Sequence, residues 1–198
     1  MALDWDEAYR TGEYRKHWDY GQASQEVAAC AALGVFPPGA VILDAGCGSG
    51  SDAVYLAALG FRVKALDVSG TALALVREKA SRAGVTVETV EGSATKMPLA
   101  DRSVDFALDR GLLHNLPDAE GSAYAGELAR VLRPGGGILL RGARSSYGGH
   151  FHPITAERIR ATFPERSFAI GPVVPITLLS DAEQDPTLDA AMVALRRK

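Results

Sequence analysis

The ten residues VILDAGCGSG at positions 41–50 decide the fold of this chain. The apolar run at 41–43 predicts a short buried strand, and the stretch 51–59 predicts a helix. Alternating glycines between them let the backbone turn sharply and let a ligand approach bare peptide groups. Because the start of a helix also offers unpaired N–H groups, this segment predicts a binding turn for a nucleotide-like ligand.

The rest of the chain continues the alternation of strands and helices. Further strands are predicted at 61–66, 85–90, 104–108 and 137–141, and helices at 23–33, 71–83, 117–132 and 156–163. This order implies right-handed crossovers and parallel strands. The last two strand-like runs, 167–179 and 190–195, are joined by a short loop, which favours antiparallel pairing. The predicted fold is α/β: a Rossmann-like, doubly wound, mainly parallel seven-stranded sheet with a C-terminal antiparallel hairpin.

Length and composition narrow the function classes. The 198 residues suit a single domain over 1–198, with the Rossmann-like core at 40–198. A net charge of -3 gives no general attraction for nucleic acid or anionic lipid. Two cysteines form no disulfide framework, and neither a leader peptide nor a long apolar span is visible. We therefore expect a cytoplasmic protein without a nucleic-acid or membrane partner, and the sequence carries no signal for its oligomeric state.

The spacing of the glycines distinguishes between ligands. A dinucleotide fingerprint needs glycine or alanine in the sixth position, where this chain has Ser51, and a phosphate-binding P-loop needs a Gly-Lys-Ser/Thr that is absent. The pattern present is D-x-G-x-G-x-G, with Asp44 at the strand end. A carboxylate here suits a cationic ligand and would repel a pyrophosphate.

This pattern resembles the first motif of the class I S-adenosylmethionine (SAM)-dependent methyltransferases. In that family the glycine turn faces the methionine part of SAM. The resemblance implies that cofactor contacts come from Asp44, Gly46, Cys47, Gly48 and Gly50. For Asp44, a role as a turn or helix-capping residue is the alternative.

Two later strand ends extend the predicted cofactor site. Asp67 can accept hydrogen bonds from both ribose hydroxyls, with Val68 beside it; capping the next helix is the alternative for Asp67, although Ser69 can take that position. At the predicted adenine end the family often has an acid where this chain has Ser93. The Ser93 hydroxyl makes a weaker hydrogen bond than a carboxylate, and the backbone of Ala94 supplies a second contact.

The segment after the fourth strand reads Asp109-Arg110-Gly-Leu-Leu-His114. It resembles small-molecule methyltransferases of the tellurite-resistance and thiopurine type, and it lacks the Asn/Asp-Pro-Pro motif of DNA amino-methyltransferases. The resemblance implies that Asp109 and Arg110 border SAM and that Asp109 and His114 serve catalysis. His114 is expected to orient a small acceptor or act as a base, with a purely structural histidine as the alternative.

The N-terminal segment 1–22 and the turn at 132–136 also match this group. In the resembling proteins an N-terminal segment covers the site as a lid, which implies a cofactor contact for Trp18. Trp5 and Tyr9 lie four residues apart and are expected to pack a helix against the core. The Leu-Arg-Pro-Gly-Gly stretch at 132–136 predicts a tight turn from helix to strand.

The loop after the fifth strand supplies the remaining candidates. Tyr147, His150 and His152 are predicted to contact the acceptor, because loops at the carboxyl edge of such sheets line the ligand crevice. Together with His114 the two histidines offer a weak metal pattern, and we expect no metal because no cysteine or second close acid supports it.

The predicted reaction is direct methyl transfer from SAM to an N, O or S atom of a small molecule, which leaves S-adenosylhomocysteine (SAH). The protein then mainly supplies alignment and a dry site. A SAM-binding regulatory protein without catalysis is one alternative. A nicotinamide-dependent oxidoreductase is the other, and Ser51 argues against it.

Overall fold

The computed structural model describes residues 4–19, 21–179 and 187–198. The chain forms two compact units, residues 1–93 and residues 94–198. The predicted organisation as a single domain stays a prediction.

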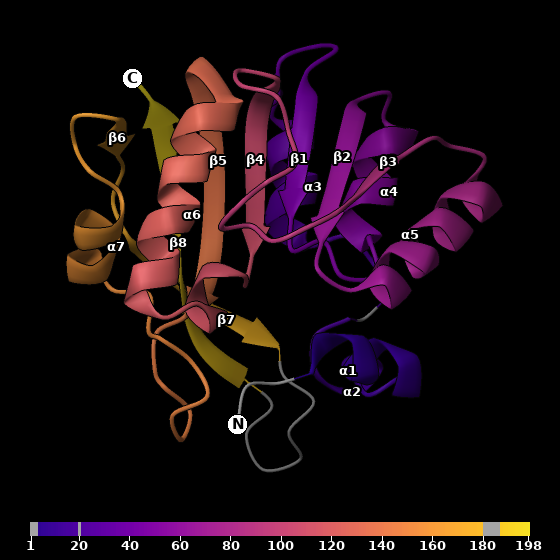
Figure 1. Cartoon of the computed structure of the whole chain (residues 1–198), viewed down its shortest axis with the longest axis horizontal. Coiled ribbons are helices and arrows are strands. Elements are labelled where there is room, and N and C mark those ends of the chain that lie inside the picture. Colours follow the sequence, from indigo (N-terminus) through magenta and orange to yellow (C-terminus); the bar gives the residue numbers. More distant parts are fainter. Residues whose placement is uncertain (1–3, 20, 180–186) are drawn as a thin grey trace. The chain divides into compact units, whose positions relative to one another are not determined.

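The first unit contains three parallel strands that lie side by side in Figure 1. They are β1 (Val41–Ala45), β2 (Arg62–Asp67) and β3 (Glu88–Glu91). Every residue of β1 is buried, as its apolar run predicts for a strand covered on both faces. The register pairs Asp44 with Ala65 and Asp67 with Glu91, so the acidic ends of β1 and β2 lie at the same edge.

Three of the five helices described in the first unit begin and end close to the predicted bounds 23–33, 51–59 and 71–83, and two further short helices precede them. The five helices are α1 (Trp5–Thr11), α2 (Tyr14–His17), α3 (Gln25–Ala32), α4 (Ser51–Ala58) and α5 (Gly70–Ala83). The Ser69 hydroxyl caps α5 by accepting the Ala72 N–H, and Gly84 ends the helix in the left-handed conformation. This capping assigns the N-cap of α5 to Ser69 and not to Asp67.

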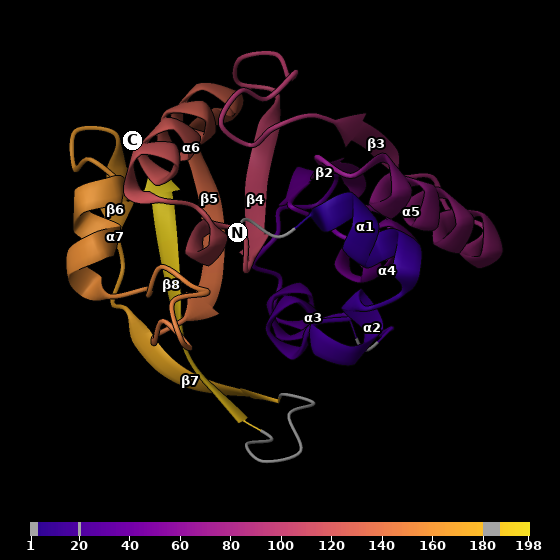
Figure 2. The same ribbon diagram turned by 60° about the horizontal axis from the view of Figure 1, so that its bottom comes forward.

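The second unit combines a parallel strand pair with an antiparallel C-terminal part. Its strands are β4 (Val104–Arg110), β5 (Leu132–Ala143), β6 (Phe168–Ile170), β7 (Val174–Leu179) and β8 (Thr187–Arg197). A 3-10 turn η1 (Leu113–Asn115) and the helices α6 (Asp118–Val131) and α7 (Ala156–Thr162) connect them. β4 and β5 are parallel, whereas β8 runs antiparallel to β5, β6 and β7. Figure 2 shows the β7–β8 hairpin extending from this sheet.

The fold class is confirmed in type, with mainly parallel strands followed by an antiparallel hairpin, but the number of strands is different. The described residues form eight strands and not seven, because the predicted run 167–179 splits into β6 and β7. Between them the Gly171 N–H donates to the Ala194 carbonyl, and a Cβ at Gly171 would lie 2.8 Å from that oxygen. The glycine therefore lets the chain pass close to β8 and leave the sheet briefly.

The predicted turn at 132–136 is wrong, because this segment lies inside β5. Leu132 already pairs with Val104, and the register shifts before Gly137 pairs with Phe106. Gly135 has a φ of +80°, which accommodates the shift. A Cβ at Gly137 would lie 2.3 Å from the Phe106 ring, so glycine is also required for the close approach of β4.

Among the described residues, no helix is long and apolar enough to cross a membrane.

Candidate cofactor and acceptor sites

The glycine turn has the backbone geometry that the sequence predicts. Gly46, Gly48 and Gly50 all have positive φ values, of 66°, 54° and 78°. Between them the Cys47 N–H donates to the Leu66 carbonyl at the end of β2. L-residues with side chains rarely adopt these angles, so the turn needs glycine at all three positions.

Asp67 joins the end of β2 to the glycine turn. Its Oδ2 accepts the Gly48 N–H over 2.9 Å, and its Oδ1 accepts the Ser69 N–H over 2.9 Å. Burial raises the pKa of Asp67, and the backbone hydrogen bonds act against this shift. Each carboxylate oxygen keeps a further lone pair, so these contacts are compatible with the predicted ribose contact.

The other predicted cofactor residues of the first unit differ in exposure. Asp44 is buried, and Cys47 is a buried thiol whose pKa burial raises well above its usual value, with Asp44 and Asp67 adding to the shift. Cys47 is therefore a neutral thiol and not a nucleophile, and its predicted cofactor contact stays a prediction. Val68 is 53% exposed and Ser93 is exposed, whereas Ala94, the first residue of the second unit, is buried.

The N-terminal aromatics pack against the first unit. Tyr9 and Tyr14 form a buried cluster with Ala72, and Trp18 packs against it. This packing of Tyr9 confirms the expected structural role, and the structure adds a second one. A Cβ at Gly48 would lie 2.5 Å from the Tyr9 hydroxyl, to which the Trp18 indole N–H donates over 3.1 Å. The Tyr9 hydroxyl therefore lies against the predicted cofactor turn, a contact that no pattern in the sequence indicates.

In the second unit, the Asp109 carboxylate holds its own loop together. It accepts backbone N–H groups from Gly111 at 3.0 Å, Leu112 at 2.7 Å and Leu113 at 3.1 Å. Burial raises its pKa to about 6. These contacts make Asp109 a positioning residue for η1; its predicted catalytic and cofactor roles stay predictions. Arg110, the neighbouring candidate, ends β4 half-buried.

His114 has one defined tautomer in its neutral form. Its Nδ1 accepts the Ala143 N–H over 2.8 Å, so the proton of the neutral ring is on Nε2. Burial lowers its pKa to about 4, and the charges of Arg141 and Arg158 add to the shift. Its ring stacks on Phe151 with centroids 4.2 Å apart. Neutral His114 can therefore donate a hydrogen bond from Nε2, but this arrangement does not support the predicted role as a base.

The pKa of His114 predicts a pH-dependent stability. Because its folded pKa of about 4 lies below the ordinary 6.5, the unfolded chain binds more protons between these values, and stability falls as the pH falls. Asp109 acts in the opposite direction, because its pKa is raised from 3.8 to about 6. Between pH 7 and pH 5, wild type should lose about 1–2 kcal/mol more unfolding free energy than His114→Gln.

Urea denaturation at both pH values measures this difference. His114→Gln keeps an oxygen that can accept the Ala143 N–H, so its fold is expected to persist. Asp109→Asn is the reference for the opposite sign, with a steeper loss than wild type on acidification. Identical pH slopes in wild type and His114→Gln would contradict the assigned protonation state.

The loop after β5 arranges the three other acceptor candidates differently. The Tyr147 hydroxyl accepts the Asp189 N–H over 2.7 Å, and its ring meets Phe151 edge to face. His150 and His152 are exposed. Tyr147 thus fixes the loop to β8, and only the two histidines present their side chains widely to solvent. All three acceptor contacts stay predictions, and the described residues include no cluster of three or more metal-ligand side chains.

Arg158 on α7 is a structural residue that sequence reasoning missed. Its guanidinium donates to the carbonyls of Leu116 at 2.6 Å, His152 at 2.8 Å and Leu113 at 3.3 Å. It thereby ties the loop after β4 to the loop after β5. Its side chain is only 11% exposed, so its removal leaves these carbonyls with fewer donors.

Arg158→Met is expected to lower the unfolding free energy by roughly 2–3 kcal/mol, because hydrogen bonds to a charged group are lost. Urea denaturation measures the change. Arg160→Met on the same helix is the matched control, since Arg160 is exposed, and its effect should stay within about 0.5 kcal/mol. Equal effects of both substitutions would show that the carbonyl contacts do not stabilise the loops.

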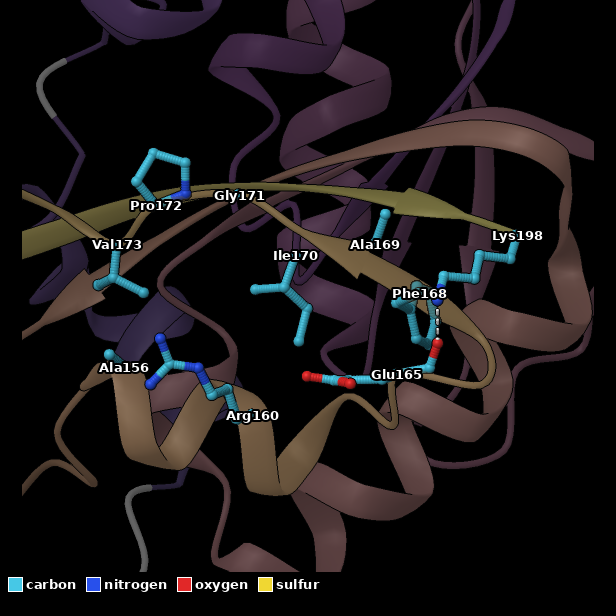
Figure 3. A pocket seen from close by; sticks show the side chains of 10 residues that line it. All are labelled: Ala156, Arg160, Glu165, Phe168, Ala169, Ile170, Gly171, Pro172, Val173 and Lys198. Atoms are coloured by element: carbon cyan, nitrogen blue, oxygen red, sulfur yellow. Dashed lines mark hydrogen bonds between the residues drawn. The ribbon is translucent and has the colours of Figure 1, made fainter.

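A surface hollow of about 270 Å³ lies elsewhere in the second unit, between α7 and β6. Figure 3 shows the Ile170 side chain pointing toward α7, with Arg160 and Glu165 beside it and Lys198 donating to the Glu165 carbonyl. None of the predicted site residues lines it. We therefore do not assign the acceptor site to this hollow.

A comparison with protein families finds a match over the segment that contains most of the predicted site residues. Residues 42–136, just under half of the chain, match a family model described as a methyltransferase domain. The matched segment contains the glycine turn, Asp67, Asp109 and His114. This match bears out the predicted class of domain, while the tellurite-resistance and thiopurine subgroup stays a prediction.

Two curated relatives each match about half of the chain. A probable S-adenosylmethionine-dependent methyltransferase of Mycobacterium tuberculosis is 36% identical over 99 residues, 50% of this chain and 34% of that protein. A fatty-acid O-methyltransferase of Mycolicibacterium smegmatis is 36% identical over 109 residues, 54% of this chain and 38% of that protein. The chain thus spans little more than a third of the length of either relative.

Solved structures share the fold over nearly the whole chain. A protein described in the conversion of a disulfide bond into a thioacetal group during echinomycin biosynthesis has a TM-score of 0.83 at 24% identity, covering 96% of this chain and 91% of that one. The Burkholderia thailandensis 1,6-didemethyltoxoflavin-N1-methyltransferase, solved with S-adenosylhomocysteine, has a TM-score of 0.74 at 24% identity, covering 98% and 86%. At this identity the likeness concerns the fold alone.

Proposed function

We propose that this protein is a SAM-dependent methyltransferase that transfers the methyl group to an N, O or S atom of a small-molecule acceptor. The observation that carries this proposal is the glycine turn. Its three glycines have positive φ, Asp67 accepts the Gly48 N–H, and the segment falls within the match to a methyltransferase domain. The products are the methylated acceptor and SAH.

The first unit holds the residues suited to SAM. Asp44 and Asp67 are buried and provide negative charge beside the glycine turn, which favours a ligand that carries a sulfonium and an ammonium. In the proposal, the turn binds the methionine part, Asp67 binds the ribose, and Ser93 with the Ala94 backbone binds the adenine. Bound SAM supplies a methyl group that is already activated, so the chain needs to contribute mainly alignment and exclusion of water.

The protonation state of His114 determines whether this residue can accept a proton from the acceptor. Since its Nδ1 is occupied by the Ala143 N–H and its pKa is about 4, His114 does not take a proton at neutral pH. We propose that its Nε2–H donates a hydrogen bond to the acceptor and orients it. An acceptor that loses its proton easily, such as a thiol, a carboxylic acid or an acidic phenol, needs no stronger base.

Within this class, we propose a small-molecule methyltransferase of the tellurite-resistance and thiopurine type. The Asp109–His114 loop and the N-terminal aromatics resemble the tellurite-resistance and thiopurine type, for which acceptors are small molecules. With a net charge of -3, the chain has no general attraction for nucleic acid. We therefore expect a small acceptor in the cytoplasm, with His150, His152 and Tyr147 contributing from the loop after β5.

Release of SAH from SAM tests the proposal. Purified protein is incubated with SAM and a panel of thiols, amines, phenols and carboxylic acids, and SAH is quantified by mass spectrometry. The panel includes fatty acids because of the O-methyltransferase relative. Acceptor-dependent SAH with at least one class is the expected result. Binding of SAM without SAH release across the whole panel would favour a SAM-binding regulatory protein instead.

A further inference from the structure

We infer that Asp19 is a positioning residue that latches an N-terminal cover, residues 4–19, onto the glycine turn and thereby sets how long the cofactor stays bound. The latching rests on contacts within the first unit alone. The effect on cofactor residence rests in addition on the proposed function, because it assumes that SAM and SAH bind at this turn.

Asp19 brings three segments together from a buried position. Its carboxylate accepts the hydroxyl groups of Ser49, in the glycine turn, and of Ser51, at the start of α4. It also pairs with the Lys79 ammonium of α5 over 3.3 Å, and Lys79 itself donates to both serines. The side chain of Asp19 is only 5% exposed. Burial alone would raise its pKa, but hydrogen bonds from Ser49 and Gly21 and the charge of Lys79 lower it overall.

A second carboxylate fixes the other end of the cover. Asp6 accepts the Ser69 hydroxyl over 2.6 Å, and the backbone N–H and hydroxyl of Thr71 over 3.0 Å each. These partners begin α5 directly after Asp67. The cover is thus attached at two points of the predicted cofactor path, beside the ribose position through Asp6 and at the glycine turn through Asp19.

The aromatic residues of the cover lie over the glycine turn. Trp18 precedes Asp19 in the chain and donates to the Tyr9 hydroxyl, which lies so close to Gly48 that no Cβ fits there. Trp5 meets Trp18 edge to face at 5.8 Å. A ligand against the turn therefore lies beneath the cover, and its exchange requires the cover to move. Because Asp19 holds Trp18 through the adjacent peptide bond, loss of its ion pair should make this movement easier.

The experiment compares three variants with wild type. Asp19→Asn removes the charge from one side of the latch, and Lys79→Met removes it from the other without altering the cover. Glu13→Gln is the matched control, because it removes a carboxylate of the cover that contacts Lys16 and His17 at the exposed surface and does not contact Asp19 or Lys79. Both tryptophans of the chain, Trp5 and Trp18, belong to the cover, so intrinsic fluorescence reports its position directly.

Two readouts are taken for each variant. Acrylamide quenching without ligand measures how far the cover has opened, and stopped-flow displacement measures the dissociation rate of SAH. We expect Asp19→Asn and Lys79→Met to increase quenching and to accelerate SAH release ~10-fold or more, the effect of losing one charged hydrogen bond. Glu13→Gln should match wild type in both readouts, and the melting temperatures serve to identify unfolded protein.

The outcomes separate this inference from the proposed function. Unchanged quenching and SAH release within two-fold of wild type, in either latch variant that folds, would overturn the latch. Equal acceleration by Glu13→Gln would overturn it as well. If wild type bound neither SAM nor SAH, the proposed function would fail, while the quenching of the ligand-free variants would still show whether Asp19 holds the cover closed.

Discussion

Gly48→Ala is expected to lower the affinity for SAM and SAH by ~100-fold or more. The added Cβ would lie 2.5 Å from the hydroxyl and 3.3 Å from the ring of Tyr9, and the residue has a φ of +54°. Tyr9 is buried and accepts the Trp18 indole, so its ring has little freedom to move away. The turn would have to shift, and the peptide groups offered to the cofactor would shift with it. Isothermal titration calorimetry with SAH measures the loss.

Gly84→Ala separates this effect from ordinary backbone strain. Gly84 has a φ of +67°, and an added Cβ there meets nothing within 4 Å. Its substitution should cost stability of about 1 kcal/mol and leave the affinity for SAH unchanged. If both alanine variants bound SAH as wild type does, the glycine turn would not be the cofactor site.

Asp67→Ala should weaken SAM and SAH binding by ~100-fold, the effect of losing the hydrogen bonds that the ribose hydroxyls donate to a charged acceptor. The same substitution leaves the N–H groups of Gly48 and Ser69 without their acceptor, so the turn loses a support as well. Calorimetry with SAH gives the overall loss. Glu88→Gln is a suitable control, because Glu88 pairs with Lys64 at the exposed surface.

A 2′-deoxy analogue of SAH isolates the ribose contact from the structural one. Wild type should bind the analogue ~10-fold more weakly than SAH, because one hydroxyl is missing. Asp67→Ala should bind both ligands equally, since the partner of that hydroxyl is already gone. A wild type that does not distinguish the two ligands would assign Asp67 to the support of the turn alone.

The sequence predicted those parts of the fold that are determined by residues adjacent in the chain. The apolar run of β1, its acidic end and the glycines that follow are adjacent in the chain, so the pattern alone indicates strand, turn and helix. The helix after Asp67 likewise has its own cap in Ser69 and its own stop in Gly84. Local patterns could not indicate that the run 167–179 divides, because the carbonyl that Gly171 approaches belongs to Ala194 in a later strand.

The parts of the site that sequence missed depend on contacts between distant residues. Asp19 and Ser49 are 30 positions apart, and Arg158 is 45 positions from Leu113. No spacing rule connects such residues before the chain has folded. His114 illustrates the same limit. The sequence left open whether it orients the acceptor, acts as a base or has a structural role, and only the folded chain places the Ala143 N–H on its Nδ1, the one nitrogen of the neutral ring that could take a proton.

A calorimetric titration of the wild-type protein with SAM, SAH and NAD tests the central claim most directly. All three ligands carry an adenosine part, so the comparison reports on what the glycine turn accepts next to it. We predict saturable binding of SAM and SAH at one site per chain and no binding of NAD at the same concentrations. Binding of NAD without binding of SAM or SAH would contradict the account.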